Sequence, residues 1–505
     1  MSFADRAVHW LYTGFTNCGS RGVRSAPTRR ETGGTTMAQA HRRIQLVILA
    51  ALALVVSPAA RAQRDAEPQT TALDRYVAAP DDSFDWKVVT RDSDEAATTL
   101  LVDLTSQTWR SPGEVDRQVW KHWLWIVVPH DCQSDVAMLM IGGGANDGHQ
   151  PEHPDGKIRA VALATGSVVA ALGQVPNQPL EFFGDGKPRY EDDLLARSWR
   201  AALAEHDMTW LGQLPMAKSA VRAMDAVQAA LAVDEQLPAV ERFVVAGGSK
   251  RGWTTWLTAI VDDRVAAIAP IVIDVLNIRE SMRNHHDAYG FWAPAVGDYE
   301  RAGLLDEMDD PVITPLLQTV DPYVYRQRLT MPKCVINASG DQFFTPDSSQ
   351  FYFDELPGDK LLCYVPNADH SLRDSTALET LTAFHASIVH GLPRPRVQWE
   401  EAGEAAWRVT STPAPTRAVL WTAHNPTARD FRADEIGAAY KRRELTASAD
   451  GWYEAAENAP AAGFTASFIE LEFDIGAPTP LRATTPVRVV GSKSEAATGS
   501  TAGGN

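Results

Sequence analysis

Ser249, in a glycine-rich turn, is the residue of this sequence whose surroundings best suit a nucleophile. It lies in Gly247-Gly248-Ser249-Lys250-Arg251-Gly252, between an apolar run that ends at Ala246 and a segment with helical spacing. Strand, tight turn and helix in this order are typical of a nucleophile elbow, where small neighbours let strand and helix approach closely. The usual spacing G-x-S-x-G is met only at its first glycine, because Arg251 stands at the second position. A serine that merely caps the helix is the alternative.

A catalytic serine needs a base, and the base needs an acid that orients it. In hydrolases with such an elbow, these groups follow along the chain in the order serine, acid, histidine. Asp341 comes in a Gly-Asp turn after one apolar run, and His370 comes after the next run. Order and strand-end placement predict a triad of Ser249, Asp341 and His370. Asp347 and Asp369 remain alternatives for the acid.

Acyl transfer through a tetrahedral intermediate also needs backbone N–H donors for the oxyanion. The N–H of Lys250, the residue after the serine, is the first expected donor. Gly143 or Gly144, which follow an earlier apolar run, would supply the second. A plain strand-to-helix turn is the alternative for these glycines. The side chains of Lys250 and Arg251 could add positive charge at the oxyanion, or could only anchor the elbow through a carboxylate.

Several further residues are candidates for substrate binding, most of them in an aromatic-rich insertion at 277–330. The candidates are Arg251, Asn146, His285, His286, Tyr289, Trp292 and Tyr299. Packing or solvent exposure is the alternative for the histidine and aromatic side chains.

A metal site is not expected. His149, Glu152 and His153 could in principle bind a metal, but Pro151 breaks the helical spacing of a zincin-type pair. The predicted acyl transfer requires no cofactor.

The elements that must position these residues alternate between β-rich apolar runs and segments with helical spacing, from about 119 to 395. This pattern is typical of an α/β fold with a doubly wound, mostly parallel sheet. Expected strands are 122–129, 136–141, 168–172, 242–246, 265–275, 332–338 and 360–365, and expected helices are 216–231, one starting at 249, and 376–390. We therefore predict an α/β-hydrolase domain at 70–395, in which 277–330 forms a cap because it is too long for an ordinary connection.

The segments after residue 395 differ from the hydrolase domain in residue pattern and composition. Short alternating runs at 397–400, 418–421 and 466–473 predict a small β-sandwich at 396–490. Residues 491–505 are rich in Ser, Gly, Thr and Ala, which predicts a disordered tail.

Residues 37–62 have the layout of a secretory signal peptide. Arg42 and Arg43 precede an apolar run at 46–56, and Ala60-Arg61-Ala62 supplies a cleavage site. Residues 1–36 are expected to be a disordered upstream extension, and either Met1 or Met37 is the true start. A membrane anchor is the alternative, but the run is shorter than the roughly 18 to 20 residues that span a bilayer. We expect an exported protein, periplasmic or secreted, with no stable membrane anchor after cleavage.

The net charge bears on possible binding partners, and the cysteines bear on a possible disulfide. Residues 1–62 hold eight basic and two acidic residues, so their removal changes the net charge from −17 to −23. So acidic a chain is not expected to bind nucleic acid. Cys334 and Cys363 lie in neighbouring predicted strands and could form a disulfide after export or remain thiols. The sequence leaves the oligomeric state open.

The run Ala246-Gly247-Gly248-Ser249-Lys250-Arg251-Gly252-Trp253-Thr254-Thr255-Trp256-Leu257, with 337–344 and Asp369-His370, resembles the PhoPQ-activated pathogenicity-related protein family. That family includes the autocrine proliferation repressor-like proteins, and the likeness extends from about 73 to 489. The resemblance implies an α/β-hydrolase fold, export and a triad of Ser249, Asp341 and His370, but no known substrate. The elbow also resembles that of glucuronoyl esterases, over a stretch too short to transfer specificity.

Together these features predict acyl transfer to water from a small-molecule or peptide-like acyl substrate. A carboxylic ester is favoured, since no motif for anchoring peptide termini stands out. A peptidase or amidase on the same triad is one alternative. The other is a secreted signalling or binding protein that does not use its hydrolase scaffold, because fold alone does not fix function.

Overall fold

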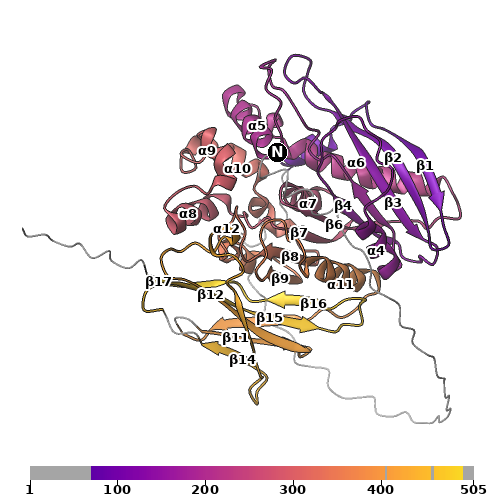
Figure 1. Cartoon of the computed structure of the whole chain (residues 1–505). Coiled ribbons are helices and arrows are strands. Elements are labelled where there is room, and N and C mark those ends of the chain that lie inside the picture. Colours follow the sequence, from indigo (N-terminus) through magenta and orange to yellow (C-terminus); the bar gives the residue numbers. More distant parts are fainter. Residues whose placement is uncertain (1–69, 404–405, 457–459, 493–505) are drawn as a thin grey trace, which may run out of the picture. The chain divides into compact units, whose positions relative to one another are not determined.

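The computed structural model describes residues 70–403, 406–456 and 460–492 (Figure 1). The predicted extension at 1–36 and the signal peptide at 37–62 lie outside the described residues, as does the predicted tail from 493 onward. The last strand, β17 (Arg488–Ser492), extends two residues into the predicted tail because it pairs with β15 (Gly463–Phe473).

A nine-stranded sheet forms the centre of the fold, in the order β1-β2-β3-β5-β4-β6-β7-β8-β9. Its strands are β1 (Asp85–Ser93), β2 (Ala97–Thr108), β3 (Val119–Pro129), β4 (Val136–Ile141), β5 (Val169–Leu172), β6 (Arg242–Gly248), β7 (Val265–Ile271), β8 (Lys333–Ala338) and β9 (Lys360–Val365). The strands from β5 to β9 in this order are parallel, and β1, β2 and β3 add an antiparallel edge. The predicted fold class is confirmed.

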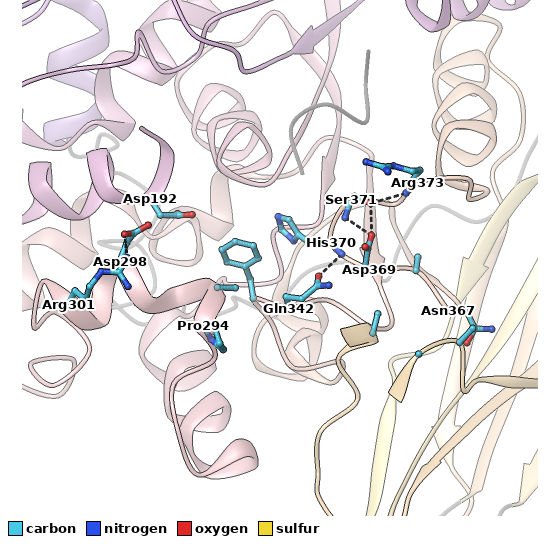
Figure 2. A pocket seen from close by; sticks show the side chains of 16 residues that line it. Asp192, Pro294, Asp298, Arg301, Gln342, Asn367, Asp369, His370, Ser371 and Arg373 are labelled. Carbon is cyan, nitrogen blue, oxygen red and sulfur yellow. Dashed lines mark hydrogen bonds and ion pairs between the residues drawn. The ribbon is translucent and has the colours of Figure 1, made fainter. Parts of the chain in front are cut away.

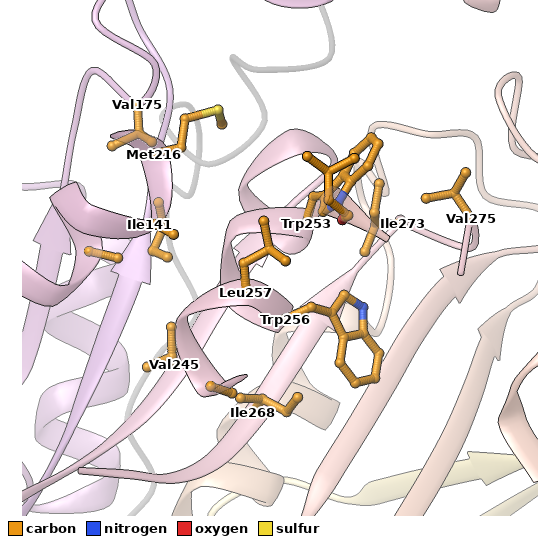
Figure 3. Close-up of a cluster of buried hydrophobic side chains, with 14 of the residues drawn as sticks. Ile141, Val175, Met216, Val245, Trp253, Trp256, Leu257, Ile268, Ile273 and Val275 are labelled. Carbon is orange, nitrogen blue, oxygen red and sulfur yellow. The ribbon is translucent and has the colours of Figure 1, made fainter. Parts of the chain in front are cut away.

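Alternate residues of the central strands point to opposite faces, so the sheet has two apolar cores. On one face Ile141, Val245 and Ile268 pack with α6 (Gln213–Ala232) and α7 (Lys250–Val261), as Figure 3 shows around Trp256. The other face packs with α4 (Gly156–Thr165) and α11 (Ala377–Val389). Both faces are covered, which is why these strands read as continuous apolar runs in the sequence.

The strand order places the elbow at a switch point of the sheet. The chain passes from β4 to β5 on one side of β4, and then returns to β6 on its other side. Loops at the carboxyl ends of strands on either side of such a point leave a crevice for ligands. Ser249 follows β6 directly.

Two differences from the predicted elements affect the site. The strand expected at 265–275 ends at Ile271, because Val272 turns the backbone to a φ of 43°. Ile273 and Val275 consequently leave the sheet. Strands β1 and β2 were not predicted, since the expected pattern began only near 119.

The predicted cap at 277–330 is an insertion of short helices between β7 and β8 (Figure 1). Its helices are α8 (Ile278–Tyr289), η3 (Pro294–Val296), α9 (Gly297–Arg301), η4 (Pro311–Ile313), α10 (Thr314–Val320) and η5 (Pro322–Arg328).

Two antiparallel sheets follow α11, as the alternating pattern predicted. One contains β10 (Arg396–Glu401), β11 (Ala406–Thr412) and β14 (Tyr453–Ala456). The other contains β13 (Lys441–Glu444), β12 (Arg417–Asn425), β15, β16 (Leu481–Thr484) and β17. The second sheet contacts the central one, where Tyr364 N donates to Thr484 Oγ1 at 3.1 Å.

Cys334 and Cys363 are buried free thiols in the paired strands β8 and β9. Cys363 lies opposite Ile336, two positions beyond Cys334. Burial raises the pKa of the Cys363 thiol to about 12. No helix within the described residues is long and apolar enough to cross a membrane.

Candidate active site

Ser249 sits in a strained turn between β6 and α7. Its φ is 57°, a left-handed value that is uncommon for residues other than glycine. A Cβ on Gly247 would lie 2.6 Å from Arg251 O, and one on Gly252 would lie 2.9 Å from both Gly247 O in β6 and Ile271 O in β7. Gly252 thus provides the close approach between helix and strand that the usual motif assigns to the preceding position.

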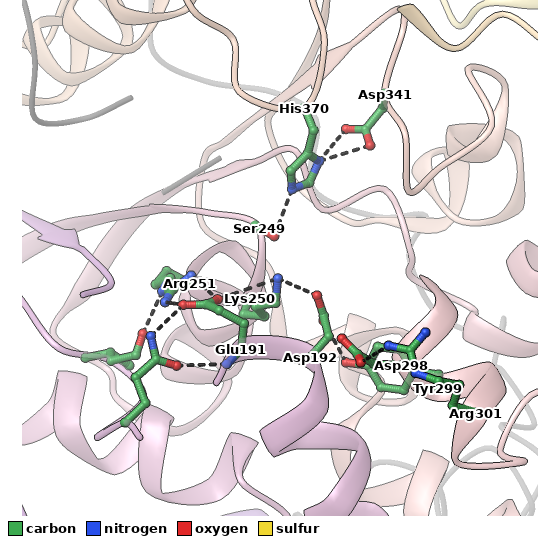
Figure 4. A network of polar contacts seen from close by, with 12 residues as sticks. Glu191, Asp192, Ser249, Lys250, Arg251, Asp298, Tyr299, Arg301, Asp341 and His370 are labelled. Atoms are coloured by element: carbon green, nitrogen blue, oxygen red, sulfur yellow. Dashed lines mark hydrogen bonds and ion pairs between the residues drawn. The ribbon is translucent and has the colours of Figure 1, made fainter. Parts of the chain in front are cut away.

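The structure brings the three predicted triad residues together (Figure 4). His370 Nε2 lies 2.9 Å from Ser249 Oγ, and His370 Nδ1 lies 2.8 Å from Asp341 Oδ2. Asp341 also accepts from Phe343 N, and His370 N donates to Gln342 Oε1. Both side chains of the Asp–His pair are buried. The imidazole is therefore held between the hydroxyl and the carboxylate.

The two alternative acids have other partners. Asp347 pairs with Arg429 and accepts from Asn284 Nδ2. Asp369 accepts from the backbone N–H and the hydroxyl of Ser371. Of the three candidate acids, Asp341 is the one in contact with His370.

Four buried charged residues form a cluster beneath the elbow: Glu191 and Asp192 at the start of α5 (Glu191–Glu205), with Lys250 and Arg251 (Figure 4). Arg251 donates to both Glu191 oxygens, and Lys250 Nζ lies 2.7 Å from Asp192 Oδ2. Burial raises the pKa of the Glu191 carboxyl, but the charges of Arg251 and Lys250 outweigh burial and lower that pKa to about 2. All four charges are compensated within the cluster.

This cluster corrects the prediction that Arg251 binds substrate. Its guanidinium donates hydrogen bonds to Glu191 and, through Nε at 2.6 Å, to Val175 O. Only 3% of Arg251 is exposed. The anchoring alternative therefore describes Arg251 and Lys250 better. Nothing in the local sequence pattern marks Glu191 and Asp192 as their partners.

Two adjoining cavities meet at the candidate triad. The first, which we call the polar cleft, has a volume of about 630 Å³ and is lined by His370, Gln342, Asp192, Asp298, Arg301 and Arg373 among others (Figure 2). The second, the apolar pocket, has a volume of about 60 Å³ and is lined by Ser249, Trp199, Trp253, Met282, Val296 and Met308 among others. Asp192 and Phe343 line both.

The C-terminal sheets contribute one wall of the polar cleft. Ala433, in the short helix α12 (Ala433–Ile436) between β12 and β13, lines it with Gly437 and Ala438. Ala433 N donates to Gly340 O at 2.9 Å, and a Cβ on Gly340 would lie 2.9 Å from that of Ala433. Gly340 thus permits the close approach of this segment to the loop that carries Asp341.

The predicted glycine loop begins beside the elbow, because Ile141 pairs with Gly247. Gly143 and Gly144 line neither cavity, and their carbonyls accept from Gln174 N and Gln178 Nε2. Their role as oxyanion donors stays a prediction.

The side chain of Asn146 lines neither cavity, which corrects the prediction that Asn146 binds substrate. Its side chain donates to Lys121 O and Asn177 Oδ1. These contacts fix the loop after β4 to its neighbours rather than offering a group to the cavities.

The aromatic residues at the end of α8 and just after it also pack rather than line the two cavities. His285 accepts from Ala293 N, and burial lowers its pKa to about 4, so the ring is neutral at pH 7. Tyr289 and Trp292 pack against His285, and His286 packs against Trp292. The substrate-binding prediction is corrected for these four residues. Tyr299 does line the apolar pocket and donates to Asp192 Oδ1 at 3.2 Å.

Asp274 is a buried carboxyl near the site that sequence reasoning missed. It follows β7 and accepts from the hydroxyls of Tyr352 at 2.6 Å and Tyr364 at 2.5 Å. Burial raises its pKa to about 7, although both hydroxyls act in the opposite direction. Among the residues that the structure describes, no three His, Cys, Asp or Glu side chains gather as metal ligands.

Comparison with known proteins places this chain in a family. Residues 73–432 match the PhoPQ-activated pathogenicity-related protein family. The chain is also 38% identical over 431 residues to Autocrine proliferation repressor protein A of Dictyostelium discoideum, an alignment that covers 80% of this chain and 86% of that protein. The chain belongs to this family. The resemblance noted in the sequence is confirmed.

Solved structures of similar fold include several esterases. Acetyl xylan esterase 1 from Thermoanaerobacterium sp. JW/SL YS485 is 15% identical with a TM-score of 0.41, and the match covers 63% of this chain and 92% of that one. A glucuronoyl esterase from Solibacter usitatus is 14% identical with a TM-score of 0.38, covering 63% and 90%. Values this low carry no conclusion about substrate.

Proposed function

We propose that this chain is an exported serine hydrolase that cleaves a carboxylic ester. The observation that carries the proposal is the single imidazole of His370, in hydrogen-bond contact with Ser249 Oγ on one side and Asp341 on the other. This is the geometry that activates a serine hydroxyl, with the base oriented by a carboxylate.

In the proposed reaction, Ser249 Oγ attacks the substrate carbonyl and gives its proton to His370 Nε2. Asp341 holds the Nδ1–H and stabilises the imidazolium that forms. The tetrahedral intermediate collapses when His370 returns the proton to the leaving alcohol, which leaves an acyl group on Ser249. Water then attacks this ester with His370 as base, and the acid and the free serine are released.

The oxyanion is stabilised mainly by the backbone at the start of α7 in this proposal. Lys250 is the first residue of that helix, so its N–H has no partner within the helix and lies at the positive end of the helix dipole. The ammonium of Lys250 is already balanced by Asp192. The side chain therefore supports the elbow, while the N–H stabilises the developing charge.

A covalent probe tests the proposal. A fluorescent fluorophosphonate should label the chain that begins at residue 63, and Ser249→Ala and His370→Ala should abolish labelling. Ser411→Ala, which changes a serine of β11, is the matched control and should label like the wild type. Equal labelling of wild type and Ser249→Ala would favour the rival, a secreted signalling or binding protein on a hydrolase scaffold.

The bond is tested separately with paired substrates. We expect p-nitrophenyl acetate to be hydrolysed with a kcat/KM at least 10-fold above that of p-nitroacetanilide, which carries the same acyl group as an amide. Faster cleavage of amides, in particular of aminoacyl anilides, would instead support the peptidase or amidase alternative on the same triad.

A further inference from the structure

The two cavities differ in which triad residue they touch. The polar cleft is lined by His370, and the apolar pocket is lined by Ser249. In acyl transfer by a serine, histidine must deliver its proton to the leaving atom. The leaving group therefore lies on the His370 side of the reacting carbonyl. The acyl chain then extends the other way, past Ser249 into the apolar pocket.

The two cavities also differ in the chemistry of their walls. The apolar pocket takes Trp253 and Ile273 from the hydrolase core, and Met282, Val296 and Met308 from the cap insertion. The indole N–H of Trp253 already donates to Val320 O at 2.7 Å, so the weak acceptor sulfurs of the methionines are the hydrogen-bonding atoms that these five side chains leave for a bound chain. Its charged groups, Asp192 and Lys250, are paired with each other. The pocket thus suits a hydrocarbon chain.

The polar cleft offers both donors and acceptors. Asp298 pairs with Arg301. Burial raises the pKa of the Asp298 carboxyl, and the nearby charge of Asp192 raises it further. Gln342, Asn367 and Arg373 complete a wall of mixed sign. At about 630 Å³ this cleft is ten times the volume of the apolar pocket. It suits a bulky group with many hydrogen-bonding atoms.

Resting on the function proposed above, we propose that the substrate is a short-chain carboxylic ester of a bulky polar alcohol. A non-hydrogen atom the size of water needs roughly 10 to 15 Å³ of such space, so the apolar pocket of about 60 Å³ holds about four to six chain atoms. Acetyl to hexanoyl groups fit this limit, and octanoyl or longer groups do not.

Chain-length selectivity tests the acyl half of the proposal. For p-nitrophenyl esters, kcat/KM should be at least 10-fold higher for acetate and butyrate than for octanoate. Met282→Ala and Met308→Ala enlarge the pocket and should raise the octanoate-to-acetate ratio about 10-fold, since one methylene in an apolar site changes kcat/KM by a factor of this order. Val275→Leu fills the pocket and should lower the butyrate-to-acetate ratio.

Met224→Ala is the matched control for the enlarging variants. Met224 is fully buried in α6 and lines neither cavity. Its loss should lower stability but leave the ratio of octanoate to acetate unchanged. The ratio does not depend on the fraction of enzyme that is folded, so partial unfolding of any variant does not affect the comparison.

A second pair of substrates tests the leaving-group half. Glucose 6-acetate should be hydrolysed with a kcat/KM at least 10-fold above that of ethyl acetate, because both release a primary alcohol but only the sugar can use the polar cleft. Equal rates for the two would overturn this half.

Other outcomes separate this inference from the proposed function. Equal kcat/KM for acetate and octanoate, or ratios unmoved by Met282→Ala and Met308→Ala, would overturn the short-acyl assignment. Fluorophosphonate labelling of Ser249 without hydrolysis of any of these esters would overturn the proposed substrate class but would still support Ser249 as the nucleophile. Absence of both labelling and hydrolysis would overturn the proposed function itself.

Discussion

Glu191 and Asp274 are two buried carboxyl groups near the candidate triad, and their pKa values shift in opposite directions. Glu191 contacts the cations of Arg251 and Lys250, and its pKa is lowered to about 2. Asp274 contacts the neutral hydroxyls of Tyr352 and Tyr364, and its pKa is raised to about 7. Burial opposes the charged form at both positions, so the kind of partner decides the outcome.

The difference shows how the two sides of the site are held. The elbow that carries Ser249 is fixed by full charges, which must stay ionised for the contacts to persist. The loop after β7 is instead fixed by a carboxyl that can keep its proton and still accept two hydrogen bonds. The two sides should therefore respond differently to mutation and to pH.

Glu191→Gln should have the largest effect on stability. It leaves Arg251 buried without its carboxylate and removes one partner of Lys250, and breaking a buried ion pair in this way costs about 3 to 5 kcal/mol. Urea unfolding at pH 7 measures this loss. Glu205→Gln, an exposed position at the other end of α5, is the matched control and should change stability little. A similar small change for Glu191→Gln would mean that the cluster does not anchor the elbow.

Asp274→Asn should change the pH dependence of stability. Because the folded pKa of about 7 exceeds the usual 3.8, the native protein keeps a proton that the unfolded chain loses. Asp274 therefore lowers the free energy of unfolding as pH rises from about 4 to 7, by about 4 kcal/mol in total. The difference in free energy of unfolding, wild type minus variant, should therefore fall by this amount between pH 4 and pH 8.

The exposed Asp82→Asn variant is the matched control for the loss of one aspartate carboxyl in this pH series. The same pH profile for Asp274→Asn as for this control would contradict the contrast between the two buried carboxyl groups. Glu191 does not affect the difference between wild type and variant, because it is present in both proteins and its contribution to stability, which is lost as pH falls from about 4.5 toward 2, cancels.

Tyr364→Phe should have the smallest effect. It removes one of two hydroxyls that donate to Asp274, which costs about 1 to 2 kcal/mol. Since that hydroxyl lowers the pKa of Asp274, its loss should also extend the fall in stability above pH 7. Urea unfolding at pH 5 and pH 8 measures both changes, with Tyr453→Phe in β14 as control. An unchanged pH profile would show that the tyrosine does not act on the carboxyl.

The sequence was informative where chemistry follows local order along the chain. The elbow, the acid and the histidine each come directly after an apolar strand, and parallel strands bring their carboxyl ends to one edge of the sheet. The sequence was silent on Glu191, Asp192 and Asp274, because long-range packing brings them to the site. It misplaced His285 and Trp292 for a related reason, since composition alone does not tell which side chains of the cap line a cavity and which pack against one another.

The central claim is that Ser249 is the nucleophile, and locating a covalent adduct tests it most directly. The chain that begins at residue 63 is treated with a fluorophosphonate, and the modified residue is found by peptide mass spectrometry. The account predicts one phosphonyl group per chain, on Ser249, and none in His370→Ala. Modification of another serine, or no modification of the folded wild-type protein, would contradict it.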